Sequence, residues 1–336
     1  MKKITIKDIA KAADVSVTTV SFVLNQKGEQ KGISREVIEK VIKVSEEMKF
    51  KPNMIASSLR TGKTRSIGLI VEDISNPFFS DLARVIEREA ADLNYRVFYC
   101  STEGDDKRAQ DLVHSLLQAK VDGFIVTPTE KMREVIDHLV QLKCPVVLAD
   151  SYFENQEVSH VVLDNYEGAY TAVEYLLQNG FTKIAFVTNY SQLIQMSLRK
   201  QGYVEALQEA GFYDESRILD MDYYISEDNR IEIISKFLGE KAEIDAVLFG
   251  ANYLLLAGLQ SFRNLGLRIP IDKAVISFDD HDSFRLHSPP ITVLAQPIEE
   301  IGKMTVQLLM GQMITVSDFK AVKEKKRGRL IIRESV

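Results

Sequence analysis

The chain has 336 residues, of which 45% are hydrophobic and 27% charged, and its formal net charge is −6. These proportions are ordinary for a soluble globular protein of two or three domains, and no run approaches the ~18 consecutive apolar residues of a membrane span. The segment 6–14 carries charged side chains where a signal peptide would be apolar, so we expect a cytoplasmic protein. Cys100 and Cys144 lie far apart and form no CxxC pattern, so we expect both to be small buried hydrophobic side chains.

The charge is divided unevenly along the chain. Residues 1–65 hold 14 Lys and Arg against 7 Asp and Glu, a net charge of +7, whereas the remaining residues hold 28 against 41, a net charge of −13. A basic segment ahead of an acidic body indicates that the first segment meets a polyanion and that the body does not. A solvated basic face is the alternative explanation for this bias.

Two short helices are predicted in the stretch TIKDIAKAADVSVTTVSFVLN, residues 5–25. Thr5 can cap the first, with Asp8 at the capping-box position, and Ser16 can cap the second after a tight break at Ala13–Val15. Each helix has one apolar stripe, consisting of Ile6, Ile9, Ala10 and Ala13 in the first and of Val20, Val23 and Leu24 in the second. The opposite side of the second helix carries small polar side chains and one aromatic ring, at Thr18, Ser21, Phe22 and Asn25.

A third helix is expected in ISREVIEKVIKVSEEMKF, residues 33–50, with Ser34 as its cap. Its apolar positions close a small three-helix core, at Val37, Ile38, Val41 and Met48. A helix, a tight turn and a second helix with an outward polar face, on a segment of net charge +7, favour helix-turn-helix DNA binding. A generic three-helix packing unit is the alternative.

The stretch KPNMIASSLRTGKTR, residues 51–65, joins this segment to the rest of the chain. Residues 53–60 have a helix-like pattern in which Met54, Ile55 and Leu59 are apolar. So short a helix is not stable alone, because nucleation costs more than its few hydrogen bonds return. A conditional helix at a domain boundary raises the question of what stabilises it.

From Ser66 onward, strand-like runs alternate with amphipathic helical stretches. The runs include SIGLIVED, RVFYCS, DGFIVTP, PVVLAD, KIAFVTN, AVLFGAN and AVISFDD. This alternation is typical of parallel sheets with helices on both faces, and the strands are too many for one small sheet. The sequence contains neither GxGxxG nor a P-loop, so nucleotide binding has little support.

Ligands of open parallel sheets bind beyond the carboxyl ends of the strands. Polar residues end several of the predicted strands, and this rule selects Glu72, Asp73, Thr127, Asp150, Asn252 and Asp279. Facing one cleft, such residues make a binding site for a hydroxyl-rich ligand, although Asp279 could instead only cap the turn after its strand. The segment FDDHDSFRLHS gathers acidic and histidine side chains, but its spacing matches no dedicated metal-ligand pattern, so no metal and no cofactor are expected.

Several stretches, in order along the chain, resemble the lactose-repressor family (LacI/GalR) of bacterial transcription regulators. They are the N-terminal stretches quoted above together with FGANYLLLAGLQSFRNLGLRIP, AVISFDDHDSFRLHSPPITVLAQPIEEIG and RLIIRES. The resemblance implies a helix-turn-helix head, a hinge helix that folds on the operator, and a two-lobed α/β body with parallel sheets, similar to periplasmic sugar-binding proteins. It places the first lobe at about 66–165 and 297–322, and the second at most of 166–296 plus the terminal strand. A homodimer on a near-palindromic operator is also implied.

The resemblance assigns residues that contact DNA. Two hinge helices of a dimer enter the minor groove, where Leu59 wedges into a base step. Val17, Thr18 and Phe22 fall where the family's base-reading side chains sit, and because an aromatic ring cannot make a bidentate contact to guanine, the operator is expected to differ from those of better-known members. The complete predicted DNA-binding set is Thr5, Ser16, Val17, Thr18, Thr19, Ser21, Phe22, Asn25, Asn53, Ile55, Ala56 and Leu59.

For the effector site, the resemblance adds Arg199, Phe78 and Phe79 and supports Asn252 and Asp279. An arginine and an aspartate together can grip vicinal hydroxyl groups, since the guanidinium donates and the carboxylate accepts. Arg199 could instead pair with a surface carboxylate, and one of the two phenylalanines is expected to belong to the core. The expected effector is a sugar or sugar derivative, with a purine and a sugar acid as alternatives.

We therefore expect a helix-turn-helix DNA-binding domain at 1–51, a hinge helix and linker at 52–65, and a two-lobed effector-binding and dimerisation domain at 66–336. The predicted function is that of a transcriptional regulator, a repressor and not an enzyme, acting at the nucleoid in the bacterial cytoplasm without membrane contact. A cytoplasmic sugar-binding receptor or enzyme with an incidental helical head is the alternative. The basic segment KAVKEKKRGRL, residues 320–330, is expected to be a solvated loop before the last strand.

Overall fold

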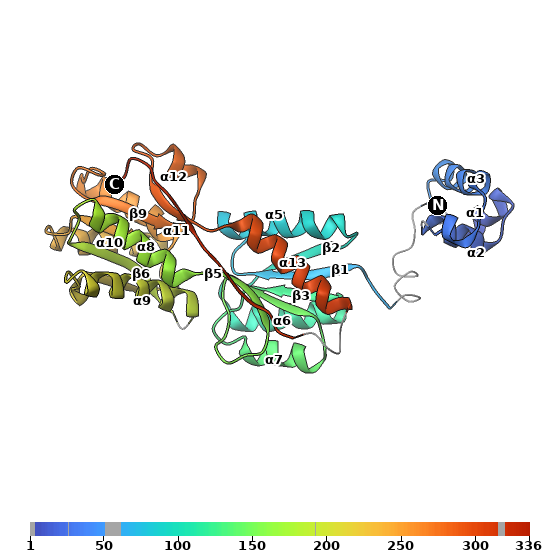
Figure 1. Ribbon diagram of the computed structural model, residues 1–336, viewed down its shortest axis with the longest axis horizontal. Coiled ribbons are helices and arrows are strands. Elements are labelled where there is room, and N and C mark those ends of the chain that lie inside the picture. Colours follow the sequence, from blue (N-terminus) through green and yellow to red (C-terminus); the bar gives the residue numbers. More distant parts are fainter. Residues whose placement is uncertain (1–3, 26, 51–61, 192, 315–319) are drawn as a thin grey trace. The chain divides into compact units, whose positions relative to one another are not determined.

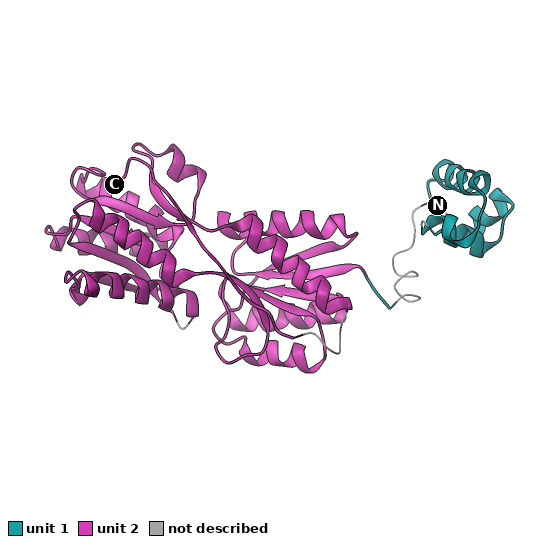
Figure 2. Ribbon diagram, in the orientation of Figure 1, with its two compact units in different colours: residues 1–64 teal, residues 65–336 magenta. Residues whose placement is uncertain are grey.

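The computed structural model describes residues 4–25, 27–50, 62–191, 193–314 and 320–336 (Figure 1). It divides the chain into two compact units, residues 1–64 and 65–336, which we call the head and the body (Figure 2). The division falls within one residue of the predicted start of the body at Ser66.

The described part of the head consists of the helices α1 Ile6–Ala13, α2 Val17–Leu24 and α3 Arg35–Glu47 and the 3-10 turn η1 Glu29–Lys31. The backbone N–H of Thr5 donates to Asp8 Oδ2 at 2.8 Å, and the N–H of Thr19 donates to Ser16 Oγ at 3.0 Å, so both predicted caps are confirmed. Asp14 adopts the left-handed conformation with φ 53°, which ends α1 and turns the chain toward α2.

The head is held together by the predicted apolar stripes. Its buried side chains are Ile9, Ala10, Ala13, Val20, Val23 and Val41. Half-buried residues pack around them, among them Leu24, Val37, Ile38 and Met48. A core of this size buries little apolar surface, so the head depends on its caps and turns more than a larger domain does.

The body contains two six-stranded sheets, one in each lobe. The first has the order β11-β5-β4-β3-β1-β2 and the second the order β12-β10-β9-β8-β6-β7. The first comprises β1 Ser66–Val71, β2 Arg96–Ser101, β3 Gly123–Val126, β4 Val146–Ala149, β5 Ser159–Leu163 and β11 Lys323–Lys326. The second comprises β6 Ile184–Tyr190, β7 Ile218–Asp222, β8 Ala246–Phe249, β9 Ala274–Phe278, β10 Thr292–Ala295 and β12 Arg329–Ile331. Among these strands, only β10 and β12 pair antiparallel.

Helices cover both faces of each sheet. On the first sheet, one face carries α5 Pro77–Asp92 and α13 Ile298–Ile314, and the other carries α6 Asp106–Gln118 and α7 Arg133–Gln141. On the second sheet, one face carries α10 Glu227–Glu240, α11 Asn252–Leu265 and α12 Asp282–Leu286, and the other carries α8 Asn165–Gln178 and α9 Ile194–Glu209. A short 3-10 turn, η2 Glu215–Arg217, precedes β7.

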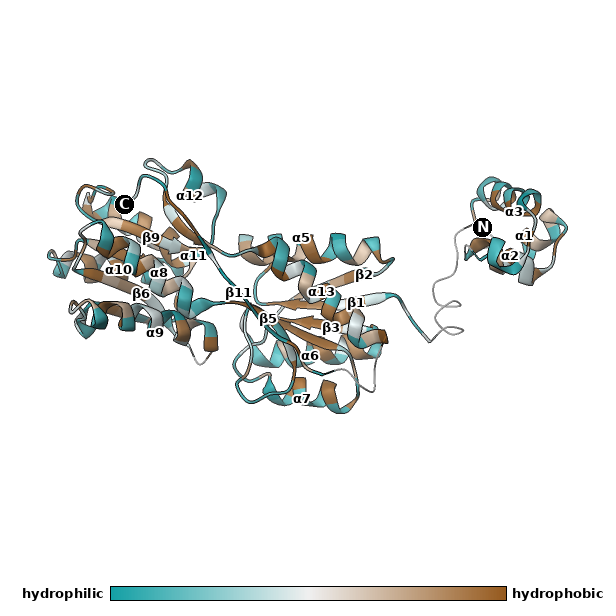
Figure 3. Cartoon of the chain, in the orientation of Figure 1, coloured by the Kyte–Doolittle hydropathy of each residue, from teal (hydrophilic) through white to brown (hydrophobic). Residues whose placement is uncertain are grey.

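The central strands of each sheet are buried along their whole length because both faces of the sheet are covered. In β1, whose six residues are all buried, Ile67, Leu69 and Val71 pack with the α5 side, while Ile70 packs with the α6 side. This division follows from the alternation of side chains along a strand. The hydropathy colouring shows the apolar strands between helices of mixed hydropathy (Figure 3).

The chain passes between the lobes after β5, after β10 and between β11 and β12. The first lobe therefore combines residues 66–163 with 298–326, close to the predicted division, but its late return continues to Lys326. The prediction that residues 320–330 form only a loop is wrong, because Lys323–Lys326 forms β11 and pairs in parallel with β5. Residues of β11 alternate between exposed and half-buried, and lysines on an edge strand discourage further pairing.

Both cysteines are free thiols that are half-buried, so the prediction that they are fully buried is wrong. Cys100 lies on the edge strand β2 and Cys144 lies in the turn before β4. Each packs against the α6 and α7 side of the core from the border of the sheet, where coverage is incomplete.

Candidate functional sites

The outward face of α2 is the candidate DNA-binding surface of the head. Val17 is 41% exposed, and Thr18, at the same N-terminal end of the helix, is exposed as well. Phe22 is half-buried, and the Nζ of Lys31 lies 5.6 Å from the centroid of its ring. This face therefore offers small side chains at the end of the helix that usually contacts bases, and a shielded ring further along.

Several other predicted DNA-binding residues make hydrogen bonds within the head. The hydroxyl groups of Ser16 and Thr19 lie 2.8 Å apart, and the Thr5 hydroxyl donates to Asp8 Oδ2 at 2.7 Å. Asn25 Nδ2 donates to the carbonyl oxygen of Ser21 at 2.6 Å. These bonds fix the ends of the two helices. The predicted hinge contacts lie outside the described residues, and they are Asn53, Ile55, Ala56 and Leu59.

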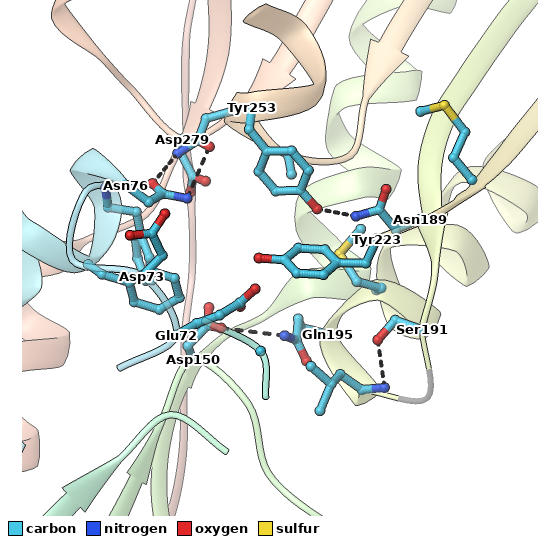
Figure 4. Close-up of a pocket in the computed structure, with 18 of the residues that line it drawn as sticks. Glu72, Asp73, Asn76, Asp150, Asn189, Ser191, Gln195, Tyr223, Tyr253 and Asp279 are labelled. Atoms are coloured by element: carbon cyan, nitrogen blue, oxygen red, sulfur yellow. Dashed lines mark hydrogen bonds between the residues drawn. The ribbon is translucent and has the colours of Figure 1, made fainter. Parts of the chain in front are cut away.

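A cleft of about 780 Å³ lies in the body, at the carboxyl ends of strands from both sheets (Figure 4). It is lined by eight of the predicted effector residues, Glu72, Asp73, Phe78, Phe79, Asp150, Arg199, Asn252 and Asp279. Thr127 is not among the lining residues, because its buried hydroxyl turns back toward β1 and donates to the carbonyl oxygen of Ile70 at 3.4 Å.

Asp150 and Asp279 occupy equivalent positions in the two lobes. Asp150 follows β4 with φ 65°, and Asp279 follows β9 with φ 66°. Aspartate tolerates this left-handed conformation better than most residues, and such conformations cluster at functional sites. Asp279 does more than end its strand, since its carboxylate accepts a hydrogen bond from Gln296 Nε2 at 2.8 Å and lines the cleft.

Arg199 is fixed inside the second lobe and is 4% exposed. Its Nε donates to Asn165 Oδ1 at 2.7 Å, and its Nη1 donates to the carbonyl oxygen of Gly250 at 2.6 Å. The guanidinium also lies 4.1 Å from the centroid of the Phe278 ring. The alternative in which Arg199 pairs with a surface carboxylate is therefore wrong, and its charge is held beside the cleft.

The buried position of the carboxyl groups changes their acidity. Burial raises the pKa of Asp150 to about 7; the positive charge of Arg199 opposes this rise, and the carboxylates of Glu72 and Asp279 add to it. Burial likewise raises the pKa of Asp279. Near neutral pH, Asp150 is divided between an ionised form that only accepts hydrogen bonds and a protonated form that also donates.

The two phenylalanines of the cleft are both part of the core. Phe78 and Phe79 are each 5% exposed, and their rings pack edge to face with centroids 5.0 Å apart. The prediction of a single core ring is therefore wrong. Tyr223 and Tyr253 supply further aromatic surface, with perpendicular rings whose centroids are 5.9 Å apart.

Sequence reasoning missed several residues that line the cleft, namely Asn76, Asn189, Gln195, Tyr223, Tyr253 and Gln296. Tyr223 directly follows β7, so the strand-end rule selects it once residues 218–222 are recognised as a strand. Asn189 is the next-to-last residue of the strand β6, so the same rule can select it. Gln195 and Gln296 reach the cleft from a helix and a connection, and no local sequence pattern indicates them.

Hydrogen bonds join the two lobes across the cleft. Asn252 Nδ2 donates to Asn76 Oδ1 at 2.8 Å, and Asn76 Nδ2 donates to Asn252 Oδ1 at 3.3 Å. The Tyr224 hydroxyl donates to the carbonyl oxygen of Gly104 at 2.8 Å. Asn252, predicted to contact the effector, thus binds the opposite lobe in this structure.

Metal and membrane sites are not found in the described part of the chain. Within residues 4–25, 27–50, 62–191, 193–314 and 320–336, no three His, Cys, Asp or Glu side chains are grouped to hold a metal ion. No helix in those ranges is long and apolar enough to cross a bilayer.

Two protein-family models match the chain. One, described as bacterial regulatory proteins of the lacI family, matches residues 5–53. The other, described as periplasmic binding proteins and sugar binding domain of the LacI family, matches residues 64–332. The two matches cover the helix-turn-helix head and the body with its cleft.

Individual proteins are similar over most of their length. The HTH-type transcriptional regulator DegA of Bacillus subtilis is 34% identical over 304 residues, which are 89% of this chain and 88% of DegA. The catabolite control protein A of Priestia megaterium is 31% identical over 92% of each chain, and the HTH-type transcriptional repressor PurR of Pasteurella multocida is 28% identical over 99% and 98%.

Solved structures share the fold. The Lac repressor bound to ONPG has a TM-score of 0.86 at 23% identity, with 100% of both chains covered. A complex of the transcriptional regulator CelR with cellobiose has a TM-score of 0.73 at 24% identity, with 99% of this chain and 100% of that chain covered. At these identities the likeness concerns the fold.

Proposed function

Because the chain belongs to the LacI family of bacterial regulatory proteins, we propose that a sugar or sugar derivative bound in its cleft controls operator binding by its head. The chain is a DNA-binding transcriptional regulator, as its relatives are, and not an enzyme. Of its relatives, PurR is named a repressor, and we propose that this chain also represses transcription.

The observation that carries the effector proposal is the meeting of Arg199, Asp150 and Asp279 in one cleft. A guanidinium donates and carboxylates accept, so adjacent hydroxyl groups of one ligand can satisfy both. The cleft volume of about 780 Å³ is within the range of small-molecule sites. Two comparisons support a sugar: the body matches a model described as a sugar binding domain, and the similar CelR structure is a cellobiose complex.

For the head, we propose that α2 lies in the major groove with Val17, Thr18 and Phe22 toward the bases. Two heads of a homodimer then read two half-sites one helical turn apart, which makes the operator near-palindromic. Leu59 of each chain wedges into a minor-groove base step between the half-sites. A regulator of this kind acts where the chromosome is, at the nucleoid in the bacterial cytoplasm.

Coupling between effector and operator is proposed to run through the relative position of the two lobes. The bonds between Asn76 and Asn252 and between Tyr224 and Gly104 hold the lobes across the cleft. A ligand in the cleft adds or replaces such bonds and so changes the preferred closure. It changes operator affinity only if it binds the DNA-competent and DNA-incompetent states unequally.

Calorimetric titration of the full chain against monosaccharides, disaccharides, sugar acids and purines tests the effector class. Mobility shifts with genomic fragments, with and without the compound that binds, test the coupling. We expect a sugar to bind with a Kd below about 1 mM and to change the affinity for a small number of fragments. Binding of a purine alone would overturn the sugar assignment, and a sugar that binds without altering any shift would overturn the coupling.

A further inference from the structure

The acidic side chains of the cleft exceed the cations that can neutralise them. Glu72, Asp150 and Asp279 point into the cleft beside the aromatic side chains (Figure 4). Asp73 is engaged locally, since its carboxylate accepts hydrogen bonds from the Ser75 N–H at 2.8 Å and the Ser75 hydroxyl at 2.7 Å. Three further acidic residues of the cleft are also engaged, Glu130 by Ser191, Asp220 by Lys200 and Asp222 by the Tyr224 N–H, so Glu72, Asp150 and Asp279 are the carboxyl groups considered for a ligand.

The cations of the cleft are already oriented by other groups. Arg199 is held by Asn165 and the carbonyl of Gly250, and its charge acts on Asp150 and Asp279. Arg230 Nη2 donates to the carbonyl oxygens of Tyr223 at 3.2 Å and Ile225 at 3.3 Å. Its guanidinium lies 5.2 Å from the centroid of the Tyr253 ring.

Of Glu72, Asp150 and Asp279, only Glu72 has no cation that lowers its pKa, since Arg199 acts on the other two. Burial raises its pKa, a hydrogen bond with the Tyr223 side chain opposes the rise, and the charge of Asp73 adds to it. Figure 4 shows Glu72 and Asp150 beside each other in the cleft, and the charge of Glu72 raises the pKa of Asp150. Two neighbouring acids, of which Glu72 alone is bonded to the Tyr223 side chain, suit a further donor that carries positive charge.

Two buried amide groups donate to the carboxylates of the cleft. Gln195 and Gln296 are 7% and 8% exposed, and each turns its Nε2 toward a carboxylate, Gln195 to Asp150 at 3.4 Å and Gln296 to Asp279 at 2.8 Å. Because a carboxylate accepts, each Oε1 is left facing away as an acceptor. Within the described residues neither Oε1 has a hydrogen-bond partner. The two amides therefore orient the carboxylates of Asp150 and Asp279 in the cleft.

Three tyrosine rings line the cleft beside these carboxyl groups. The rings of Tyr223 and Tyr224 are perpendicular with centroids 5.3 Å apart, and Tyr223 is also perpendicular to Tyr253. Rings that meet at right angles beside carboxylates are a recurrent setting for ammonium groups, since the ring faces attract cations. The positive charge of Arg230 lies against Tyr253, which leaves the Tyr223 side, next to Glu72, as the place for a second cation.

We propose that the effector carries a protonated amino group beside its hydroxyl groups, and that this group binds between Glu72 and Asp150, next to the Tyr223 ring. An ammonium group has three donors and no acceptor, which matches these partners. The chemical class is an amino sugar. The inference rests on the proposed sugar effector, whose hydroxyl groups are held by Arg199 and Asp279.

The test compares three forms of each hexose on the full chain by calorimetry near pH 6.5. The probes are glucose, galactose and mannose, their 2-amino forms and their N-acetylated amino forms, with putrescine as a cation that is not a sugar. We expect one amino sugar to bind at least about 30-fold more tightly than both its hexose and its N-acetylated form, the scale of a buried charge pair.

The Glu72→Gln variant removes the charge and keeps the shape. It is expected to reduce the preference for the amino form over the hexose, both measured on the variant, to less than about 3-fold. The control is Glu103→Gln, which removes a carboxylate of the same lobe outside the cleft, exposed and paired with Arg108 at 2.8 Å. It should retain the full preference. Far-ultraviolet circular dichroism and operator shifts show that both variants fold.

The other outcomes distinguish the proposed sugar effector from the inferred amino group on it. A hexose that binds as tightly as its amino form would overturn the inference and leave the sugar effector standing. Loss of hexose and amino-sugar binding in equal measure on Glu72→Gln would also overturn it. Binding of putrescine without any sugar would support the cation and overturn the sugar effector.

Discussion

The head and the body present their binding groups in opposite ways. The head displays small side chains on the exposed face of α2, on a segment of net charge +7, whereas the body gathers buried polar groups in a cleft within a segment of net charge −13. Non-specific DNA binding is shared among many phosphate contacts. In the cleft each polar group has one or two partners. Loss of a single side chain should therefore weaken effector binding more than it weakens non-specific DNA binding.

The largest expected effect is that of Arg199→Ala on the effector. The change removes the cation that acts on Asp150 and Asp279 and leaves Asn165 Oδ1 without its donor. We expect effector affinity to fall by about 2–4 kcal/mol, because partners are left buried and unpaired. Calorimetry with the compound identified in the panel measures this loss, and Asp279→Ala should produce a loss of the same size.

Arg84→Ala is the control for these variants. Arg84 lies on the first lobe with its side chain 63% exposed and pairs with Asp81 at 3.1 Å, so its loss should change effector affinity by less than about 0.5 kcal/mol. Tight effector binding that persists in both cleft variants, with the control also unchanged, would show that the effector binds elsewhere. Operator binding by the two cleft variants without ligand is a further test of the comparison. It should equal that of the parent, since the head is unchanged.

Leu59→Ala is the corresponding change on the DNA side. Leu59 lies outside the described residues, and its role as a wedge follows from the family resemblance. We expect specific operator binding to weaken by about 2–3 kcal/mol, since the bend in the DNA loses the side chain that stabilises an unstacked step. Binding to random DNA should barely change because the positive charges remain. Competition mobility shifts with operator and random fragments measure both, and equal losses on the two would contradict a wedge.

The parts of the molecule differ in how far the sequence predicts them. In the head, the stripes of α1 and α2 and the caps Thr5 and Ser16 depend on neighbours within a few residues, and they were predicted correctly. In the body, the strands β1, β2, β3, β4, β6, β8 and β9 coincide with apolar runs that were read as strands. Local periodicity is enough to predict these helices and strands. A helix with one buried face has an apolar stripe, and a strand with two buried faces is a continuous apolar run.

The cleft was predicted only where a buried strand points to it. Asp150 and Asp279 follow strands that are buried at every position, so the strand-end rule selects them. The rule failed for Tyr223 because β7, ILDMD, is an edge strand with one buried residue and does not read as an apolar run. The rule also wrongly selected Thr127. This residue follows a buried strand, but its side chain points away from the cleft, and the rule does not predict side-chain direction. Gln195 and the Asn76–Asn252 pair depend on how two distant lobes meet, which local patterns do not contain.

The stability of the body should depend on pH in a direction opposite to that of most carboxylates. The pKa of Asp150 is about 7 in the folded chain and 3.8 as its ordinary value. Between pH 4 and 7 the folded state therefore holds more protons than the unfolded state, so the free energy of unfolding falls as pH rises. We expect Asp150 to contribute a loss of about 3 kcal/mol across this window. Urea titrations at several pH values measure it.

The variant Asp150→Asn isolates this contribution. It replaces the carboxyl group with an amide that does not titrate, so the part of the slope between pH 4 and 7 that belongs to Asp150 should disappear. The head has no part in this effect, and its unfolding should follow the same pH dependence in the parent and the variant. An unchanged slope for the body would mean that the Asp150 carboxyl titrates near its ordinary pKa.

The smallest expected effect is the loss of a serine helix cap, which can be tested in both the head and the body. Ser16 caps α2 of the head by accepting from the Thr19 N–H at 3.0 Å, and Ser226 caps α10 of the body by accepting from the Asn229 N–H at 3.2 Å. Replacing either serine by alanine should cost about 1 kcal/mol. The units contain residues 1–64 and 65–336, so the same loss is a larger share of the unfolding entropy of the head. We expect Tm to fall by about 4–8 °C for the head transition on Ser16→Ala and by no more than about 2–4 °C for the body transition on Ser226→Ala. Calorimetric scans of the full chain measure both transitions.

A single transition that moves equally in the two variants would show that head and body unfold as one cooperative unit. The contrast between the two regions would then be one of binding chemistry alone.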